Sequence, residues 1–245
     1  MGRPERAQNR REQPGPWWLA RGLEELPAGL DWLSSEEQRH LARLEVEKRR
    51  SDWLLGRWTA KSALRARSSW VGVDTDPADL TVRQAADGAP EALLRGQHLP
   101  LALSISHRSG WGLCALVPEA MLVGCDLEVV EARSPAFLED YFTTQEQAAL
   151  RAASAVERDR FATLFWATKE SALKALRVGL RADTRRIRVE VPGEPGAKEE
   201  WCRLAVQDTQ SDLRFGGWSK MLAELAVVLV TSPPSGEPVE LAGEP

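Results

Sequence analysis

The chain has 245 residues, 43% of them hydrophobic and 28% charged, which is typical of a soluble globular protein. Its net charge of −4 argues against a nucleic-acid-binding protein, and no stretch reaches the roughly 18 apolar residues that a membrane span needs. The three cysteines lie in apolar stretches and indicate reduced core thiols rather than a disulfide framework. We therefore expect a cytoplasmic protein of one large domain or two small ones.

Both ends of the chain are polar. Residues 1–16 are Arg-rich and lack the apolar core of a secretory signal, and residues 232–245 are rich in Pro, Gly and Ser. We expect a disordered arm and a disordered tail there. Between them we place an N-terminal half over residues 17–117 and a C-terminal half over residues 118–231.

The N-terminal half begins with a candidate strand within residues 16–26. Ser34 followed three residues later by Glu37 is a capping-box signature, which predicts a helix starting there. A second apolar-periodic helix is expected over residues 53–64. Residues 80–82 are a further strand candidate.

Two alternating stretches then predict a hairpin. Residues 101–107 and 111–117 read as strands, and Ser109-Gly110 supplies the turn between them. A cluster of basic residues precedes this hairpin. We interpret the cluster either as a solvated helix face or as a site for a small polyanion. Its members are Arg39, His40, Arg43, Lys48, Arg49, Arg50, Arg57, Lys61, Arg65 and Arg67.

The C-terminal half opens with a short apolar strand over residues 121–130. Residues two apart on a strand share a face, so Asp126 and Glu128 point one way. Cys125 and Leu127 point the other way, into a core.

A helix is predicted over residues 158–176, where Trp166, Glu170 and Lys174 are spaced four apart and form one stripe. A fold that lays this stripe beside the strand brings three carboxylates and an ammonium group together. Three acidic oxygen donors suit Mg²⁺, and lysines suit the phosphates that such a metal serves. Further candidate elements are residues 144–150, 186–191, 201–206 and 222–230.

Each of these motifs can also be interpreted as an ordinary surface feature without a role in catalysis. An Asp-x-Glu on a strand is usually a solvated face, and a Glu four residues before a Lys is usually a surface pair. The chain contains a similar pattern at residues 72–76, which runs into Pro77 and reads as a turn.

A faint internal repeat connects the halves. Trp58-Thr59-Ala60-Lys61 resembles Trp166-Ala167-Thr168-Lys169. If the repeat is real, it implies two related α+β halves with one site in a cleft between them, which is a usual place for ligands.

Together these motifs resemble the Sfp-type 4′-phosphopantetheinyl transferases. That family has a Gly-x-Asp-x-Glu strand, here Gly124 to Glu128, followed by Trp-x-x-Lys-Glu-x-x-x-Lys, here Trp166 to Lys174. It also has a Ser-x-Ser-His strand end, here Ser104 to His107, and a helix like the one at Leu54-Leu55-Gly56-Arg57. The resemblance implies an α+β fold of two similar subdomains in a pseudo-twofold arrangement.

The resemblance also implies a reaction. The phosphopantetheine arm of coenzyme A would be transferred to a serine of an acyl or peptidyl carrier protein, releasing adenosine 3′,5′-bisphosphate. Asp126, Glu128 and Glu170 would hold Mg²⁺ against the pyrophosphate, with Lys174 nearby, and Ser106 and His107 would contact coenzyme A phosphates. Either Glu170 or a metal-bound water would take the serine proton. Lys169 is ambiguous between a phosphate contact and solvated surface, and Trp166 is interpreted as packing.

Two positions depart from the family pattern. Ala89 stands where the family often has a phosphate-binding Lys, so we expect Arg50, Arg57 or Lys61 to substitute. Arg177 stands where the family commonly has Gly. Neither change removes a proposed metal ligand.

Two other functions compete with the transferase. A metal-dependent nuclease fits the mixture of acids and lysines, although the net acidic charge counts against it. An inactive carrier-protein-binding module is disfavoured by the intact set of Asp126, Glu128, Glu170 and Lys174. We expect a monomer, and the sequence leaves the carrier open among fatty-acid, polyketide and nonribosomal-peptide types.

Overall fold

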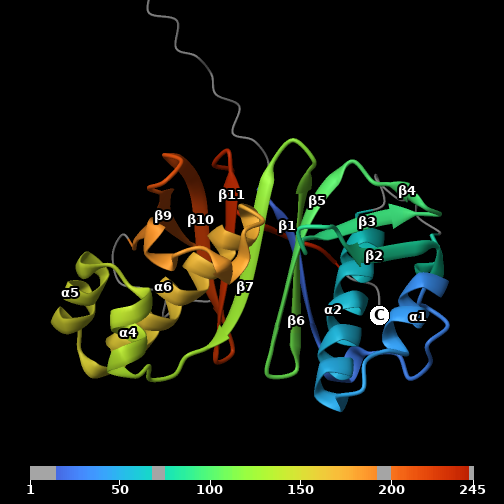
Figure 1. Cartoon of the computed structure of the whole chain (residues 1–245), viewed down its shortest axis with the longest axis horizontal. Coiled ribbons are helices and arrows are strands. Elements are labelled where there is room, and N and C mark those ends of the chain that lie inside the picture. Colours follow the sequence, from blue (N-terminus) through green and yellow to red (C-terminus); the bar gives the residue numbers. More distant parts are fainter. Residues whose placement is uncertain (1–14, 68–74, 192–199, 243–245) are drawn as a thin grey trace, which may run out of the picture.

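The computed structural model describes residues 15–67, 75–191 and 200–242. Two sheets pack face to face between two long helices, with α2 on one side and α6 on the other (Figure 1). This is the mixed α+β fold that the sequence predicts. Residues 1–14 of the expected arm and residues 72–74 of the expected turn lie outside the described residues.

The sheet of the N-terminal half has the strand order β12-β1-β6-β5. Its strands are β1 (Trp17–Gly22), β5 (Leu101–Arg108), β6 (Trp111–Pro118) and β12 (Val239–Glu240). The predicted hairpin is present as β5 and β6, paired from Leu101 with Pro118 to Arg108 with Trp111. A smaller sheet, β2-β3-β4, comprises Leu80–Gln84, Pro90–Leu94 and Gln97–His98.

The sheet of the C-terminal half has the order β7-β11-β10-β9-β8. Its strands are β7 (Leu122–Val129), β8 (Ile187–Glu190), β9 (Cys202–Asp208), β10 (Leu213–Leu222) and β11 (Leu225–Ser232). The helices are α1 (Ser35–Leu41), α2 (Glu47–Ala66), α4 (Pro135–Tyr141), α5 (Thr144–Ala152) and α6 (Ala155–Ala175). Short 3₁₀ turns are η1 (Leu23–Glu25), η2 (Pro77–Asp79), η3 (Gly179–Arg181) and η4 (Thr184–Arg186).

Strand alternation builds the layers. On β6, Leu113 joins the core between the two sheets, whereas Cys114 joins the core under α2. On β11, Val227 joins the core between the sheets, whereas Val228 joins the core under α6. Because every second residue changes face, each sheet buries one side against its helix and the other side against its partner sheet.

The described tail differs from the disordered segment that the sequence predicts. β12 pairs in parallel with β1, since Val239 N donates to Pro16 O at 2.9 Å and Leu241 N donates to Trp18 O at 2.9 Å. The Leu241 side chain is buried. An open strand edge gains hydrogen bonds by such pairing, and this outweighs the Pro- and Gly-rich composition.

None of the helices within the described residues combines the length and the apolarity that a membrane crossing requires.

Candidate functional site

The glycine of the Gly-x-Asp-x-Glu strand allows α6 to lie directly on β7. A Cβ atom built on Gly124 would overlap the carbonyl oxygen of Ser171 and stand 2.9 Å from the Ala175 nitrogen. A side chain of any size would therefore push the helix away. This close approach brings the predicted stripe of α6 against the acidic face of β7.

Lys174, at the end of that stripe, is bonded to Asp126. Lys174 Nζ donates to Asp126 Oδ1 at 2.7 Å, to the Cys125 carbonyl at 3.0 Å and to Ser106 Oγ at 3.1 Å. Ser106 Oγ itself donates to Asp126 Oδ1 at 2.7 Å. Burial works to lower the pKa of Lys174, but the carboxylates of Asp126 and Glu170 outweigh it, and the pKa is raised. The ammonium group is therefore charged at neutral pH.

Glu128 lies two residues after Asp126 on β7, close to two arginines. Its Oε2 is 3.3 Å from Arg133 and 3.5 Å from Arg108. Burial, and then the charge of Asp126, raise the pKa of Glu128, while the two arginines act in the opposite direction. Trp166 contributes a side-chain hydrogen bond to Glu128, so the first residue of the stripe supports this carboxylate as well.

Glu170 completes the group of acids. Its pKa is raised to about 7, first by burial and then by the charge of Asp126, with Glu128 adding to the effect and Lys174 opposing it. The structure thus brings together the carboxylates that the strand and helix periodicities placed on facing surfaces. Their mutual repulsion makes this a site for a cation or a proton.

The raised pKa predicts how stability depends on pH without added metal. Between the ordinary glutamate pKa of 4.5 and about 7, Glu170 is protonated in the folded chain and ionised in the unfolded chain. The folded state binds more protons, so this group stabilises it below that window and its contribution is lost as the pH rises through it. Urea unfolding at pH 5 and pH 8 should therefore show a smaller fall in unfolding free energy for Glu170→Gln than for the wild-type chain. An equal fall would contradict the assignment.

The donor set fits Mg²⁺ in its chemistry, although its acids are partly engaged by cationic side chains. Within the described ranges, no three His, Cys, Asp or Glu side chains are already arranged to hold a metal. Lys174 pairs with Asp126, and Arg108 and Arg133 pair with Glu128. Asp126 Oδ2 is nevertheless buried without a hydrogen-bond partner among the described residues, and Glu170 is repelled by its neighbours. Hard carboxylate oxygens in this number suit Mg²⁺.

Two cavities lie near these residues, one lined by Lys174 and one by His107, and neither lining includes Asp126, Glu128 or Glu170. The first, which we call the Lys174 cavity, has a volume of about 420 Å³ and lies between the halves, lined by Ala89, Ser104 and Lys174 among others. The second, the His107 cavity, has a volume of about 410 Å³ and is lined by Arg57 and His107. Both include Gly88, Pro90 and Ile105 in their walls, so they are neighbours, and we refer to the two together as the cleft.

Arg57 and His107 offer cationic groups to this cleft. Arg57 is 9% exposed, its Nε has no hydrogen-bond partner among the described residues, and its guanidinium carbon lies 4.9 Å from the Trp53 ring centroid. Burial lowers the pKa of Arg57, an effect opposed by Glu37. His107 Nδ1 is 3.9 Å from Asp52 Oδ2, and burial lowers the His107 pKa. His107 is therefore a cleft side chain rather than a core histidine.

Three basic residues expected to contact coenzyme A phosphates lie elsewhere. Arg50 donates to the Leu41 carbonyl at 3.0 Å and lines a separate hollow with Asp31. Lys61 and Lys169 have fully buried side chains, ion-paired to Glu37 and Glu146 respectively. Burial forces each ammonium group to take a protein partner, so we correct those phosphate assignments.

The sequence reasoning missed an ion pair across the first cavity. Arg177 Nε lies 2.7 Å from Asp87 Oδ2, which joins the end of α6 to the β2–β3 turn beside Ala89. Arg177 has a φ of 59°, so it occupies the left-handed conformation that favours glycine after a helix. That fits the glycine that the resembled family has there. The roles of Arg108 and Arg133 at Glu128 also had no signal in the motifs.

Comparison with known proteins finds a family model that matches part of the chain. The family model of the 4′-phosphopantetheinyl transferase superfamily matches residues 122–226. The matched segment is less than half of the chain. Within it lie Asp126, Glu128, Glu170 and Lys174, whereas Ser106 and His107 precede it.

Among solved structures, the chain is similar to a holo-(acyl-carrier-protein) synthase from Bacillus anthracis str. Ames, crystallised in complex with CoA (3′,5′-ADP). The identity is 22% and the TM-score 0.36, and the similarity covers 44% of this chain and 96% of that one. No curated protein matches the chain.

Proposed function

We propose that the protein transfers the 4′-phosphopantetheine group of coenzyme A to a serine hydroxyl of an apo acyl or peptidyl carrier protein, as an Sfp-type transferase. The observation that carries this proposal is the union of Asp126, Glu128, Glu170 and Lys174, of which Lys174 lines the cavity between the two halves. This set lies within the segment that the superfamily model matches. A carboxylate group beside a fixed ammonium suits the cleavage of a pyrophosphate.

Asp126, Glu128 and Glu170 would hold Mg²⁺. When bound, the metal would neutralise charge that develops on the leaving phosphate. Lys174 holds a positive charge beside Asp126, where it would bind the pyrophosphate. The proton of the attacking serine would be taken by Glu170 or by a metal-bound water.

Coenzyme A would lie along the cleft, with its phosphates toward Ser106, His107 and Arg57. Because Arg57 has a buried, unpartnered Nε, we expect Arg57→Gln to raise KM for coenzyme A about 10-fold, the scale of one lost hydrogen bond to a charged group. The turnover number should change little, since Arg57 lies away from the acidic group. Steady-state kinetics with a saturating apo carrier measures both constants.

Arg50→Gln is the matched control. Arg50 lies about two turns earlier on α2 but bonds to the Leu41 carbonyl in a separate hollow. KM for coenzyme A should therefore stay within about two-fold of the wild-type value. A larger effect from Arg50 than from Arg57 would contradict this placement of the phosphates.

The reaction can be tested by product analysis. Incubation with coenzyme A, Mg²⁺ and an apo carrier protein should release adenosine 3′,5′-bisphosphate, detected by chromatography, and omission of the carrier or the metal should stop its release. Cleavage of nucleic acid without such release would favour the nuclease. Because both halves of the cleft belong to one chain, we also propose a monomer, which light scattering would test.

A further inference from the structure

Each half of the molecule contains one lysine sealed in its core. Lys61 on α2 and Lys169 on α6 both follow a tryptophan by three residues, and both side chains have 0% exposure. A buried ammonium group is costly unless every charge and hydrogen bond is satisfied. These two residues are not used in the proposed reaction.

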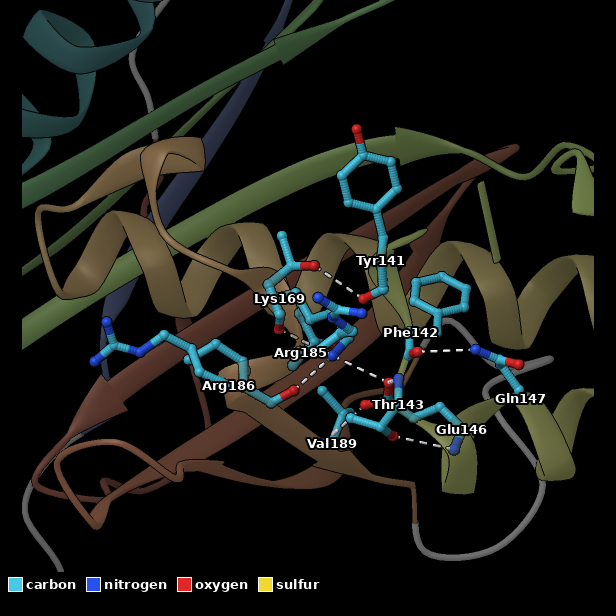
Figure 2. Close-up of polar contacts among 12 residues, drawn as sticks. Tyr141, Phe142, Thr143, Glu146, Gln147, Lys169, Arg185, Arg186 and Val189 are labelled. Carbon is cyan, nitrogen blue, oxygen red and sulfur yellow. Dashed lines mark hydrogen bonds and ion pairs between the residues drawn. The ribbon is translucent and has the colours of Figure 1, made fainter. Parts of the chain in front are cut away.

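The contacts of Lys169 join α6 to three other segments. Its Nζ lies 3.0 Å from Glu146 Oε2 and donates to the carbonyls of Thr184 at 3.1 Å and Ile187 at 2.6 Å. Figure 2 shows Lys169 directed toward Glu146 and the η4–β8 segment, on the side of α6 away from β7. Lys169 thus ties the helix to α5, η4 and β8.

Glu146 is itself held on both oxygens. As part of the capping box of α5, its Oε2 accepts from the Thr143 nitrogen at 2.8 Å, and its Oε1 accepts from the Val189 nitrogen at 3.2 Å (Figure 2). The carboxylate cannot move without breaking the start of α5 or the edge of β8. It is a rigid anchor for Lys169.

The N-terminal half repeats this arrangement. Lys61 Nζ pairs with Glu37 and donates to the carbonyls of Trp32 and Pro77, both at 2.9 Å. Glu37 accepts from the Ser34 nitrogen in the capping box of α1 and from the Val82 nitrogen of β2. The faint sequence repeat therefore corresponds to the same buried Lys–Glu pair in each half. The residue after the lysine differs between the two copies, since it is Ser62 in one half and Glu170 in the other.

Lys169 directly precedes Glu170 in the sequence, so the position of Lys169 affects the direction of the Glu170 side chain. Consecutive residues of an α-helix are turned by about 100° around its axis, so a residue fixed on one side sets the direction of the next. Lys169 fixes α6 from the side of η4 and β8, and the close contact at Gly124 fixes it from the side of β7. We propose that the Glu146–Lys169 pair is a positioning device that aims Glu170 at Asp126 and Glu128, an inference that rests on the proposed function.

The test is Mg²⁺ affinity, measured by calorimetry without coenzyme A. The paired variant Glu146→Gln/Lys169→Met removes both charges together, so no unpaired ion stays buried. Lys169→Met, in which Glu146 keeps its hydrogen bonds from the Thr143 and Val189 nitrogens, serves if the paired variant does not fold. We expect the dissociation constant for Mg²⁺ to rise about 10-fold or more in the paired variant, the usual effect of losing an outer support of a metal ligand.

The matched control is Glu37→Gln/Lys61→Met, which removes the same device from the other half. It should lower thermal stability to a similar extent but leave Mg²⁺ affinity within about two-fold of the wild-type value. Equal losses of affinity in both variants, or no loss in the C-terminal variant, would overturn the inference.

The failure of the two proposals can be told apart. If the wild-type chain binds Mg²⁺ in the Lys169-dependent manner but transfers nothing, the proposed function fails and the positioning role stands. If the wild-type chain transfers phosphopantetheine and the C-terminal variant binds Mg²⁺ normally, the positioning role fails alone. If the wild-type chain binds no Mg²⁺ in the absence of coenzyme A, the positioning role fails, and the transfer assay alone decides the proposed function.

Discussion

Glu170→Gln should lower the turnover number for phosphopantetheine transfer at least about 100-fold while the chain stays folded. The substitution keeps the size of the side chain but removes a charge that would hold the metal and accept a proton, and each role is worth a large factor. Glu170 is crowded by Asp126 and Glu128, so losing its charge relieves repulsion in the metal-free chain. We therefore expect unfolding in urea to occur at an equal or higher concentration than for the wild-type chain.

Glu157→Gln on the same helix is the control for this prediction. Glu157 is an exposed capping-box residue of α6, and glutamine fills that role as well. Its turnover number should equal that of the wild-type chain. Wild-type turnover in Glu170→Gln would show that the acidic group on β7 and α6 is not the reaction centre.

Gly124→Ala should destabilise the fold by about 3 kcal/mol or more, because the added methyl group overlaps backbone atoms of α6 and not a flexible side chain. The helix would have to move away from β7, which would separate Lys174 from Asp126. We therefore expect loss of transfer even in the fraction that remains folded. Urea denaturation followed by tryptophan fluorescence measures the change in stability.

Gly56→Ala on α2 is the comparison variant. Its nearest new contact would be Ile105 Cγ2 at 3.3 Å, the end of a side chain, and alanine favours a helix interior more than glycine does. Its stability should stay within about 1 kcal/mol of the wild-type value. Similar stabilities for the Gly124 and Gly56 variants would contradict the close packing of α6 on β7.

The face of the site could be predicted from sequence because it depends on local periodicity. Alternation on β7 put Asp126 and Glu128 together, and spacing by four put Trp166, Glu170 and Lys174 together. The structure brings these two faces into contact. What periodicity alone could not give is the partner of each charge, such as Arg133 at Glu128, because that depends on how the chain folds around the strand.

The partners of the two buried lysines could not be predicted from local periodicity either. Lysine is among the residues least often buried, so local pattern assigns Lys61 and Lys169 to the surface or to a ligand. Their burial depends on carbonyl groups of distant turns and on a capping-box glutamate. The signal that could have found them is the repeated Trp-x-x-Lys helix in each half, preceded each time by a Ser or Thr with Glu three residues later.

The sequence analysis missed four strands, β3, β4, β10 and β12, and the last two illustrate different physical reasons. β10 contains Gly216 and Gly217, which lower strand propensity, yet a Cβ on Gly217 would lie 2.8 Å from Leu204 Cβ, so packing requires the glycine. β12 is a very short strand that forms only against the edge of β1, near the opposite end of the chain. In both cases tertiary contacts override local propensity.

The central claim is a covalent transfer, and the intact mass of the carrier protein tests it most directly. An apo carrier protein incubated with this protein, coenzyme A and Mg²⁺ should gain the mass of one phosphopantetheine group at its acceptor serine, and a carrier with that serine replaced by alanine should gain nothing. An unchanged mass on fatty-acid, polyketide and nonribosomal-peptide carriers alike, with a folded protein that binds Mg²⁺, would contradict the account.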